Sequence, residues 1–302
     1  MTISKTQKKT IAIASSFIVV LAIAATLIYK KPKEKASAPV PVATQPTAQT
    51  SGAAPVAAAP IQGEMYHTAA MTTATPAKEL AELVGSANVQ MVLEINRIDA
   101  RLIKKGAVLV IPNSFDGAAA LSPFPARLEI ANDIPKLMLI SQAVQAFGIY
   151  ESGALVRWGG VSSGKQSTQT PSKLYFTNWK GKEVHSSFSD EWILKWNFNL
   201  DNKEGIGMHQ YEMPGYPASH SCVRMFGVDA EWVYNWADQW VLSDDEQAVV
   251  HYGTPVIVFG QYGFGKTAPW KNLPKDAAAT TVSVATLEKA IGANKDTIIE
   301  RQ

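Results

Sequence analysis

Residues 205–225 read GIGMHQYEMPGYPASHSCVRM and contain the only cysteine of the chain. Cys222 lies two residues after His220 and two residues before Arg224. If this stretch is extended, the three side chains share one face, because strand side chains alternate with a period of two. A thiolate is the reactive form of cysteine, and a nearby imidazolium or guanidinium lowers the thiol pKa by favouring the anion. The pattern therefore predicts a nucleophilic cysteine with a lowered pKa.

A second histidine, His209, follows a glycine-containing stretch that would let the backbone approach a site closely. Two other uses of the thiol remain as alternatives. It would be a buried small hydrophobe, or a zinc ligand together with His209 and His220. A fourth zinc ligand would then come from His185 or His251. Since Arg224 on the same face would repel a cation, we expect covalent catalysis without a metal or another cofactor.

Composition excludes several classes of protein. The chain has 302 residues, 46% of them hydrophobic, which is enough to form one large or two modest cores. Its net charge of +2 is too small to indicate a nucleic-acid surface. A single cysteine forms no disulfide within the chain, so a disulfide-stabilised scaffold is excluded.

The N-terminal region predicts attachment to a membrane. Residues 11–29 read IAIASSFIVVLAIAATLIY and carry no charge, and their length matches a bilayer core of ~30 Å. We predict a transmembrane anchor there, preceded by a cytoplasmic N-terminus at residues 1–10. The alternative is a cleaved signal peptide, because residues 22–24 read AIA after a lysine-containing start. Both interpretations export the rest of the chain.

Residues 30–62 predict a flexible tether. They are rich in Ala, Pro, Thr and Val and contain no aromatic residue, so they bury too little apolar surface to offset the entropy of ordering. An extended proline-rich segment rises roughly 3.1 Å per residue. Such a tether would hold a folded body tens of ångströms from a membrane.

A small α+β unit is predicted at residues 63–113. Residues 78–84 and 89–95 show helical apolar spacing, and residues 107–111 form a short apolar run typical of a strand. Part of this segment resembles the second half of a lysin motif, a module that binds wall glycans. The matching residues are Leu93 to Arg97, Leu102, Gly106, Leu109, Ile111 and Pro112. The alternative is a helical extension that packs on the next domain.

Residues 135–260 predict a mainly β domain. Apolar runs separated by turn residues indicate strands at 136–141, 143–150, 155–161 and 254–259. An antiparallel meander is the expected arrangement. Residues 228–240 have a helical period that places Trp232, Trp236 and Trp240 on one side, where we expect them to pack against the core. Residues 261–302 form a C-terminal extension without an assigned role.

The stretch 205–225 resembles the signature of the L,D-transpeptidase catalytic-domain family. Other segments follow in the order typical of that family: VSSGK at 161–165 with Thr170-Pro171, WNF at 196–198 and GTPVI at 253–257. The resemblance covers roughly residues 136–259 and implies a β-sandwich with a short helix after the catalytic motif. The sequence departs at Ser221, where most members have glycine, and at Ser172-Lys173, where Thr-Gly is more usual.

The resemblance implies roles for the two histidines and the thiol. Cys222 would be the nucleophile, and His209 the base that takes its proton, oriented by the backbone carbonyl of Gln210. His220 would order the site beside the sulfur. The backbone N–H groups of Ser221 and Cys222 would form an oxyanion hole.

Two further side chains are expected to bind substrate. Arg224 would hold the site or a substrate carboxylate through its planar guanidinium, with a purely structural ion pair as the alternative. Residues 189–199 read SDEWILKWNFN, and in the family this region often covers the cleft. Trp196 would then form a wall of the substrate channel beneath a lid. The alternative is a surface helix or loop that inserts Trp196 into the core.

The function implied by the resemblance is a peptidoglycan L,D-transpeptidase. Cys222 would form a thioester with a stem tetrapeptide, release D-alanine and transfer the acyl group to an amine, giving a 3→3 cross-link; carbapenems would acylate the same sulfur. Carboxypeptidase or endopeptidase activity, or anchoring of a protein to the wall, are alternatives on the same site. A noncatalytic wall-binding protein is the alternative of another class. The expected partners are stem peptides, glycan strands and the membrane, in the bacterial envelope outside the cytoplasm.

Overall fold

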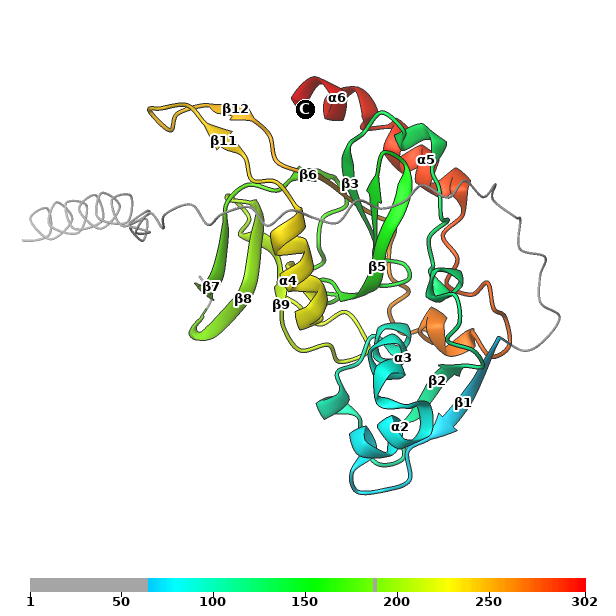
Figure 1. Cartoon of the computed structure of the whole chain (residues 1–302). Helices are drawn as coiled ribbons and strands as arrows, with labels where there is room; N and C mark the ends of the chain where they lie inside the picture. Colours follow the sequence, from blue (N-terminus) through cyan, green and yellow to red (C-terminus); the bar gives the residue numbers. More distant parts are fainter. Residues whose placement is uncertain (1–64, 187–188) are drawn as a thin grey trace, which may run out of the picture. The chain divides into compact units, whose positions relative to one another are not determined.

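The computed structural model describes residues 65–186 and 189–302 (Figure 1). The predicted cytoplasmic N-terminus, the transmembrane anchor at 11–29 and the tether at 30–62 lie outside the described residues. Of the helices in the described part, none is long and apolar enough to span a bilayer.

Nine strands form one continuous sheet in the order β6-β13-β3-β4-β5-β10-β9-β8-β7. Their bounds are β3 Lys136–Ser141, β4 Ala146–Glu151, β5 Ala154–Ser162, β6 Leu174–Phe176, β7 Lys180–Ser186, β8 Ser189–Asp201, β9 Ile206–Gln210, β10 Val223–Met225 and β13 Pro255–Phe259. A separate hairpin pairs β11 (Val241–Leu242) with β12 (Val249–His251). The mainly β fold class is confirmed by these strands.

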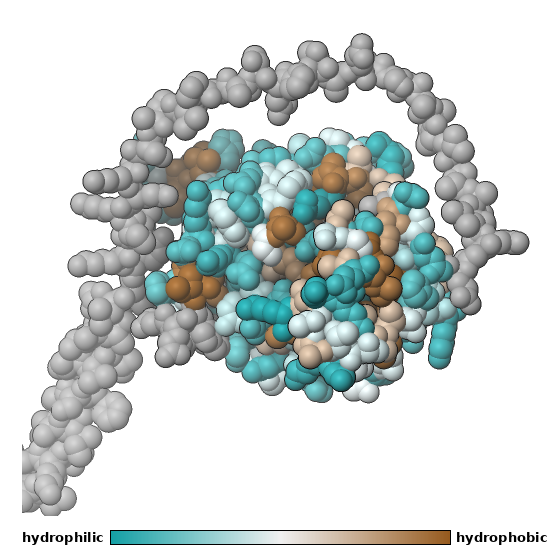
Figure 2. All heavy atoms as spheres, turned by 60° about the horizontal axis from the view of Figure 1, so that its bottom comes forward, coloured by the Kyte–Doolittle hydropathy of each residue, from teal (hydrophilic) through white to brown (hydrophobic). Residues whose placement is uncertain are grey.

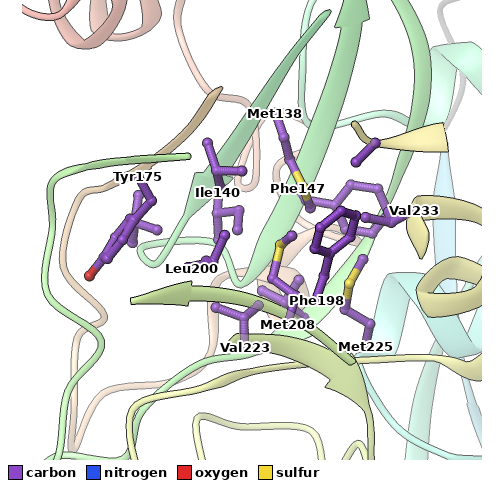
Figure 3. Packing of buried hydrophobic residues seen from close by; sticks show 14 of the residues in the cluster. Met138, Ile140, Phe147, Tyr175, Phe198, Leu200, Met208, Val223, Met225 and Val233 are labelled. Atoms are coloured by element: carbon purple, nitrogen blue, oxygen red, sulfur yellow. The ribbon is translucent and has the colours of Figure 1, made fainter. Parts of the chain in front are cut away.

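The predicted sandwich is instead a single curled sheet. The short strand β10 joins the two halves, because it pairs antiparallel with β5 and parallel with β9. Side chains from β3 and β4, such as Met138 and Phe147, meet Phe198 of β8 and Met208 of β9 in one buried cluster (Figure 3). The two halves therefore enclose a common core without separating into two sheets.

The predicted meander is correct only for β3, β4 and β5, which pair antiparallel in sequence order. Two neighbouring pairs, β13 with β3 and β10 with β9, are parallel. Parallel neighbours need a crossover connection of a dozen or more residues, and residues 211–222 provide it between β9 and β10. This crossover contains most of the stretch that suggested catalysis.

The helix expected at 228–240 is α4, Gly227–Trp236, and ends earlier because Ala237 is extended. The rings of Trp232 and Trp236 stack with centroids 5.5 Å apart and pack against the core cluster. Trp240 lies beyond the helix. Two of the three tryptophans therefore have the predicted packing role.

The predicted α+β unit has a β-α-α-β order. Strands β1 (Tyr66–Ala70) and β2 (Val108–Pro112) pair antiparallel, and helices α2 (Pro76–Val84) and α3 (Val89–Asn96) lie between them in sequence. Pro76 begins α2, where its missing N–H costs no hydrogen bond. The Glu79 carboxylate accepts hydrogen bonds from the N–H groups of Thr72 and Thr73, each at 2.9 Å. We call residues 65–112 the N-terminal unit; its assignment as a lysin motif stays a prediction.

The N-terminal unit shares its core with the large sheet. The buried cluster around Leu80 and Val92 also contains Met213 and Phe226, which precede and follow Cys222 in the sequence. The exposed apolar side chains of the unit include Leu83 and Val108. Figure 2 shows a face on which apolar patches are separated by hydrophilic side chains. The N-terminal unit therefore packs against the large sheet through a shared core.

The C-terminal extension packs on both parts. Trp270, in the short 3-10 helix η5 (Pro269–Asn272), is 1% exposed and packs with residues of the N-terminal unit. Helices α5 (Val284–Gly292) and α6 (Lys295–Arg301) bury Leu287, Ile291 and Ile298 against the second core cluster of the sheet. The extension thus covers hydrophobic surface that the strands leave open.

Two buried carboxyl groups lie between the N-terminal unit and the sheet. Glu94 of α3 accepts a hydrogen bond from the Gly160 N–H at 2.6 Å, and Asp229 of α4 binds Arg157 at 2.7 Å. Burial raises the pKa of Glu94 well above its ordinary value, and the neighbouring Asp229 raises it further. Burial likewise raises the pKa of Asp229, against the effect of Arg157. Oδ2 of Asp229 is buried with no hydrogen-bond partner among the described residues, and we expect a protonated Glu94 carboxyl to donate to it.

We expect Glu94→Gln to remove a pH dependence of stability. A raised folded-state pKa contributes stability that is full below the unfolded pKa and is lost as pH rises through the folded pKa. The free energy of unfolding of the wild type should therefore fall between about pH 5 and pH 8 relative to the variant, which should be more stable by about 1–2 kcal/mol at the upper end. Urea unfolding at both pH values measures this.

The matched control is Glu82→Gln on the surface of α2, where the side chain is 67% exposed. It should keep the wild-type pH dependence. If Glu94→Gln also kept the wild-type pH dependence, Glu94 would be ionised in the folded protein. A hydrogen bond donated by a protonated Glu94 to Asp229 would then be excluded.

Candidate active site

The site is formed where β9 and β10 lie side by side. In their parallel register His209 is opposite Arg224. The alternate residues Met208, Val223 and Met225 point into the core cluster. Because strand side chains alternate, His209 and Arg224 project from the other face of the sheet. Cys222, two residues before Arg224, reaches the same face.

The structure brings the four predicted polar side chains into one pocket. Its lining residues are Ser186, Leu194, His209, Tyr211, Ser219, His220, Cys222 and Arg224. The extended conformation begins only at Val223, because residues 220–222 form a bend. The shared face therefore comes from the bend together with the strand and not from a strand over 220–224.

His209 is held in the form of a proton acceptor. Its ring is 4% exposed, and Nδ1 lies 3.1 Å from the backbone carbonyl of Gln210, the predicted orienting group. Nδ1 therefore donates to that carbonyl and leaves Nε2 as the acceptor. The pKa of His209 is lowered to about 4, mainly by burial and to a smaller extent by the nearby Arg224 charge, against the raising effect of the Gln210 hydrogen bond. The imidazole is neutral at pH 7.

The pKa predicted for the thiol is wrong in direction. Burial raises the pKa of Cys222 above its ordinary value, and this outweighs the opposing effects of a hydrogen bond from the Gly207 backbone and of the Arg224 charge. The sulfur also lies 3.5 Å from the Gly205 carbonyl oxygen, to which a thiol donates. The resting cysteine is thus a neutral thiol in the same pocket as a neutral imidazole.

Ser221 stands at a position that favours glycine. Its φ is +94°, in the left-handed region that costs a side chain roughly 1–2 kcal/mol. Thr170 holds this bend, because its hydroxyl donates to the Ser221 carbonyl at 2.8 Å and accepts from the Gly164 N–H at 3.0 Å. The Ser219 hydroxyl donates to the Cys222 carbonyl. The oxyanion role of the Ser221 and Cys222 amides stays a prediction.

His220 contacts a lysine that the sequence analysis did not select. Nζ of Lys165 lies 2.9 Å from Nε2 of His220. An ammonium group only donates, so Nε2 accepts and the proton of a neutral ring is on Nδ1. Lys165 is the last residue of the VSSGK segment, which is part of the family resemblance. That segment is the sequence feature from which Lys165 could have been chosen as a site residue.

Arg224 binds backbone carbonyls instead of forming the ion pair considered from the sequence. Its guanidinium donates to the carbonyls of Glu212 at 3.2 Å and Ala218 at 3.1 Å. Its carbon Cζ lies 4.6 Å from the centroid of the Tyr211 ring. Arg224 therefore ties two points of the crossover, Glu212 and Ala218, to β10, and its binding of a substrate carboxylate stays a prediction.

The segment expected as a lid, or as a surface helix or loop, is part of strand β8. It pairs with β7 on one side and β9 on the other. Trp196 has a φ of +53° within a bulge between Lys195 and Phe198. Its ring meets Tyr234 edge-to-face at 5.4 Å and packs against the core cluster, whereas Leu194 lines the pocket. This supports the core interpretation of Trp196.

We therefore expect Trp196→Ala to act mainly on stability. Truncation of a partly buried aromatic should lower the free energy of unfolding by about 2–3 kcal/mol, somewhat less than for a fully buried ring. The ratio of hydrolysis to transfer should stay the same, because Leu194 still lines the pocket. A melting curve and a product ratio on this variant test both points; a changed ratio at unchanged stability would restore the channel-wall interpretation.

The described residues, 65–186 and 189–302, contain no group of three or more His, Cys, Asp or Glu side chains that could hold a metal ion. His185 lies on β7 and His251 on β12, and both side chains are exposed.

Residues 135–258 match the model of the YkuD family, the L,D-transpeptidase catalytic domain. This match confirms the resemblance seen in the sequence, and the residues that line the pocket lie within the matching segment. The match does not include the N-terminal unit. Comparison with curated proteins gives no match.

Several solved structures resemble the chain. An L,D-transpeptidase from Stackebrandtia nassauensis is 19% identical with a TM-score of 0.37, and the alignment covers 62% of this chain and 78% of that one. An enzyme of the same name from Mycobacterium smegmatis is 17% identical with a TM-score of 0.33, covering 42% and 59%. One from Enterococcus faecium is 18% identical with a TM-score of 0.33, covering 41% and 50%. This chain thus spans little more than half the length of the latter two.

Proposed function

We propose that the protein is a peptidoglycan L,D-transpeptidase that uses Cys222 as its nucleophile. The observation that carries the proposal is one pocket, within the matching domain, lined by the cysteine, a neutral buried His209, His220 and Arg224. A base whose Nδ1 is held by a carbonyl presents Nε2 for proton transfer, which is the arrangement that a thiol nucleophile requires.

The proposed reaction has two steps. Sγ of Cys222 bonds to the carbonyl carbon of the third stem residue while its proton moves to Nε2 of His209. The amide bond to the terminal D-alanine breaks, the leaving amine takes that proton, and a thioester remains. An amine on a second stem then bonds to the thioester carbonyl carbon and gives a proton to His209, the bond to sulfur breaks, and that proton returns to Sγ, which leaves a 3→3 cross-link and the free thiol. Both steps are acyl transfers without a change of oxidation state, and each proton that His209 takes up is given back. The proposed reaction therefore requires no cofactor.

Other acceptors would use the same thioester. Water gives L,D-carboxypeptidase or endopeptidase activity, and a lysine of an exported protein gives attachment of that protein to the wall. A noncatalytic peptidoglycan-binding protein is the alternative of another class. The neutral base beside the thiol favours the enzyme, because binding alone needs neither group.

Incubation with tetrapeptide stems followed by mass spectrometry tests the proposal. We expect release of D-alanine, a transient acyl adduct on Cys222 and cross-linked dimers. Release without dimers would favour the hydrolytic alternative. Binding of the stems without D-alanine release would contradict the enzyme.

We also propose that the protein acts in the bacterial envelope, attached to the membrane through residues 11–29 with the catalytic domain outside the cytoplasm. The support is the uncharged length of that segment and the location of peptidoglycan. The N-terminal unit would bind glycan strands. Fractionation tests the anchor: the protein should stay in the membrane pellet after an alkaline wash, and its release would contradict an anchor.

A further inference from the structure

The crossover between β9 and β10, residues 211–222, is anchored outside the catalytic sheet. Met213 within the crossover is 0% exposed, and Phe226, which follows β10, is 4% exposed. Both belong to the buried cluster formed by helices and strands of the N-terminal unit, including Leu80 and Val92. Apolar anchors therefore precede and follow Cys222, and both lie in the same neighbouring core.

The crossover also pairs with the N-terminal unit through its backbone. Asp99 donates its N–H to the Met213 carbonyl at 2.8 Å, and its carboxylate accepts the Met213 N–H at 2.9 Å. Ile98 and Pro214 form an antiparallel bridge, and the Gly215 N–H donates to the Arg97 carbonyl at 2.8 Å. Residues 97–99 thus act as a short partner strand for residues 213–215.

A second set of polar contacts leads from the unit to the bend that contains the thiol. Arg97, 1% exposed, donates to the carbonyl of Gln145 at 3.2 Å. The Gln145 amide exchanges two hydrogen bonds of 2.8 Å with Ser163. The Ser163 carbonyl accepts the N–H groups of Ala218 and Ser219, each at 3.1 Å. Both ends of the crossover are therefore supported by the N-terminal unit.

We infer that the N-terminal unit is a positioning part of the active site, and that Asp99 is the positioning residue which holds the crossover and thereby places Cys222 against His209. The N-terminal unit is thus required for the reaction at Cys222, whether or not it also binds glycan. This inference rests on the proposed function for its catalytic readout. Its structural readout, access to the sulfur, does not depend on that function.

The test is Asp99→Ala in the full chain, measured in two ways. The rate of D-alanine release at saturating free tetrapeptide should fall at least about tenfold, because small misplacement of reacting groups has large effects on rate. Alkylation of Cys222 by iodoacetamide should become several-fold faster, because burial of the thiol is lost. Cys222 is the only cysteine in the chain, so alkylation reports on this sulfur alone.

Two matched variants separate positioning from general loss of stability. Asp99→Asn keeps an oxygen that accepts the Met213 N–H and should recover most of the wild-type rate. Glu79→Ala removes the carboxylate that holds Thr72 and Thr73 in the same unit, away from the crossover. It should lower the melting temperature of the protein while D-alanine release and alkylation stay within about twofold of wild type.

The outcomes are distinct. Slower release with faster alkylation in Asp99→Ala alone supports the inference. Unchanged alkylation and release in Asp99→Ala, or equal changes in Glu79→Ala, overturn it. If the wild type releases no D-alanine, the proposed function fails, whereas the alkylation rates still decide whether Asp99 positions the sulfur.

Discussion

Cys222→Ser is expected to abolish thioester formation and to lower D-alanine release by at least about 10³-fold. Serine has nearly the same shape, but its hydroxyl is far less acidic than a thiol, and the neutral His209 that suits a thiol is too weak a base for it. The fold should remain, because the site side chain is replaced by one of similar volume. D-alanine release and intact mass after incubation with stems measure the effect.

A carbapenem provides an independent readout of the same sulfur. Imipenem should add its mass to the wild type and leave the serine variant unmodified. A melting curve within a few degrees of wild type shows that the variant is folded. An adduct that persists in folded Cys222→Ser would mean that another side chain is acylated, and the nucleophile would then be misassigned.

His209→Ala is expected to slow acylation by about 10²- to 10⁴-fold, the usual loss when a general base is removed. Because burial lowers the pKa of His209 to about 4, the neutral base is present at all pH values above that. The acid limb of the wild-type acylation rate should therefore lie near pH 4 and not near 6.5. The basic limb reports on the thiol, whose pKa burial raises.

His220→Ala is the matched control for this prediction. His220 also lines the pocket, but its Nε2 lies 2.9 Å from Nζ of Lys165, so that nitrogen is engaged by a donor and is not available to take the thiol proton. Its loss should slow acylation much less than that of His209 and should leave the acid limb in place. If the acid limb disappears in His220→Ala and persists in His209→Ala, the two roles are exchanged.

Local pattern in the sequence was enough to select residues that line the pocket. His209, Cys222 and Arg224 lie in one short stretch, and the parallel pairing of β9 with β10 and the bend at residues 220–222 bring them together. The strands β3 and β5 were found from apolar runs bounded by turn residues. Strand positions and the choice of these site residues depend on residues that are close together in the sequence, so they can be predicted from local patterns.

Features that depend on distant contacts were not accessible in this way. The thiol pKa was predicted with the wrong sign, because burial of the sulfur in the folded protein outweighs the effect of the neighbouring Arg224 charge. Lys165 reaches His220 across 55 positions of sequence. Trp196 lies in a bulge of β8 and its ring packs against the core. The sequence around Trp196 does not show that a bulge is present.

The burial that raises the Cys222 pKa also affects its resistance to oxidation. Peroxide reacts with thiolates, and the rate follows the ionised fraction and the exposure of the sulfur. A sulfenic acid at Cys222 would find no second cysteine in this chain to form a disulfide that protects it from further oxidation. Keeping the sulfur protonated would therefore protect the proposed nucleophile, because a sulfenic acid there has no second cysteine in this chain with which to form a disulfide.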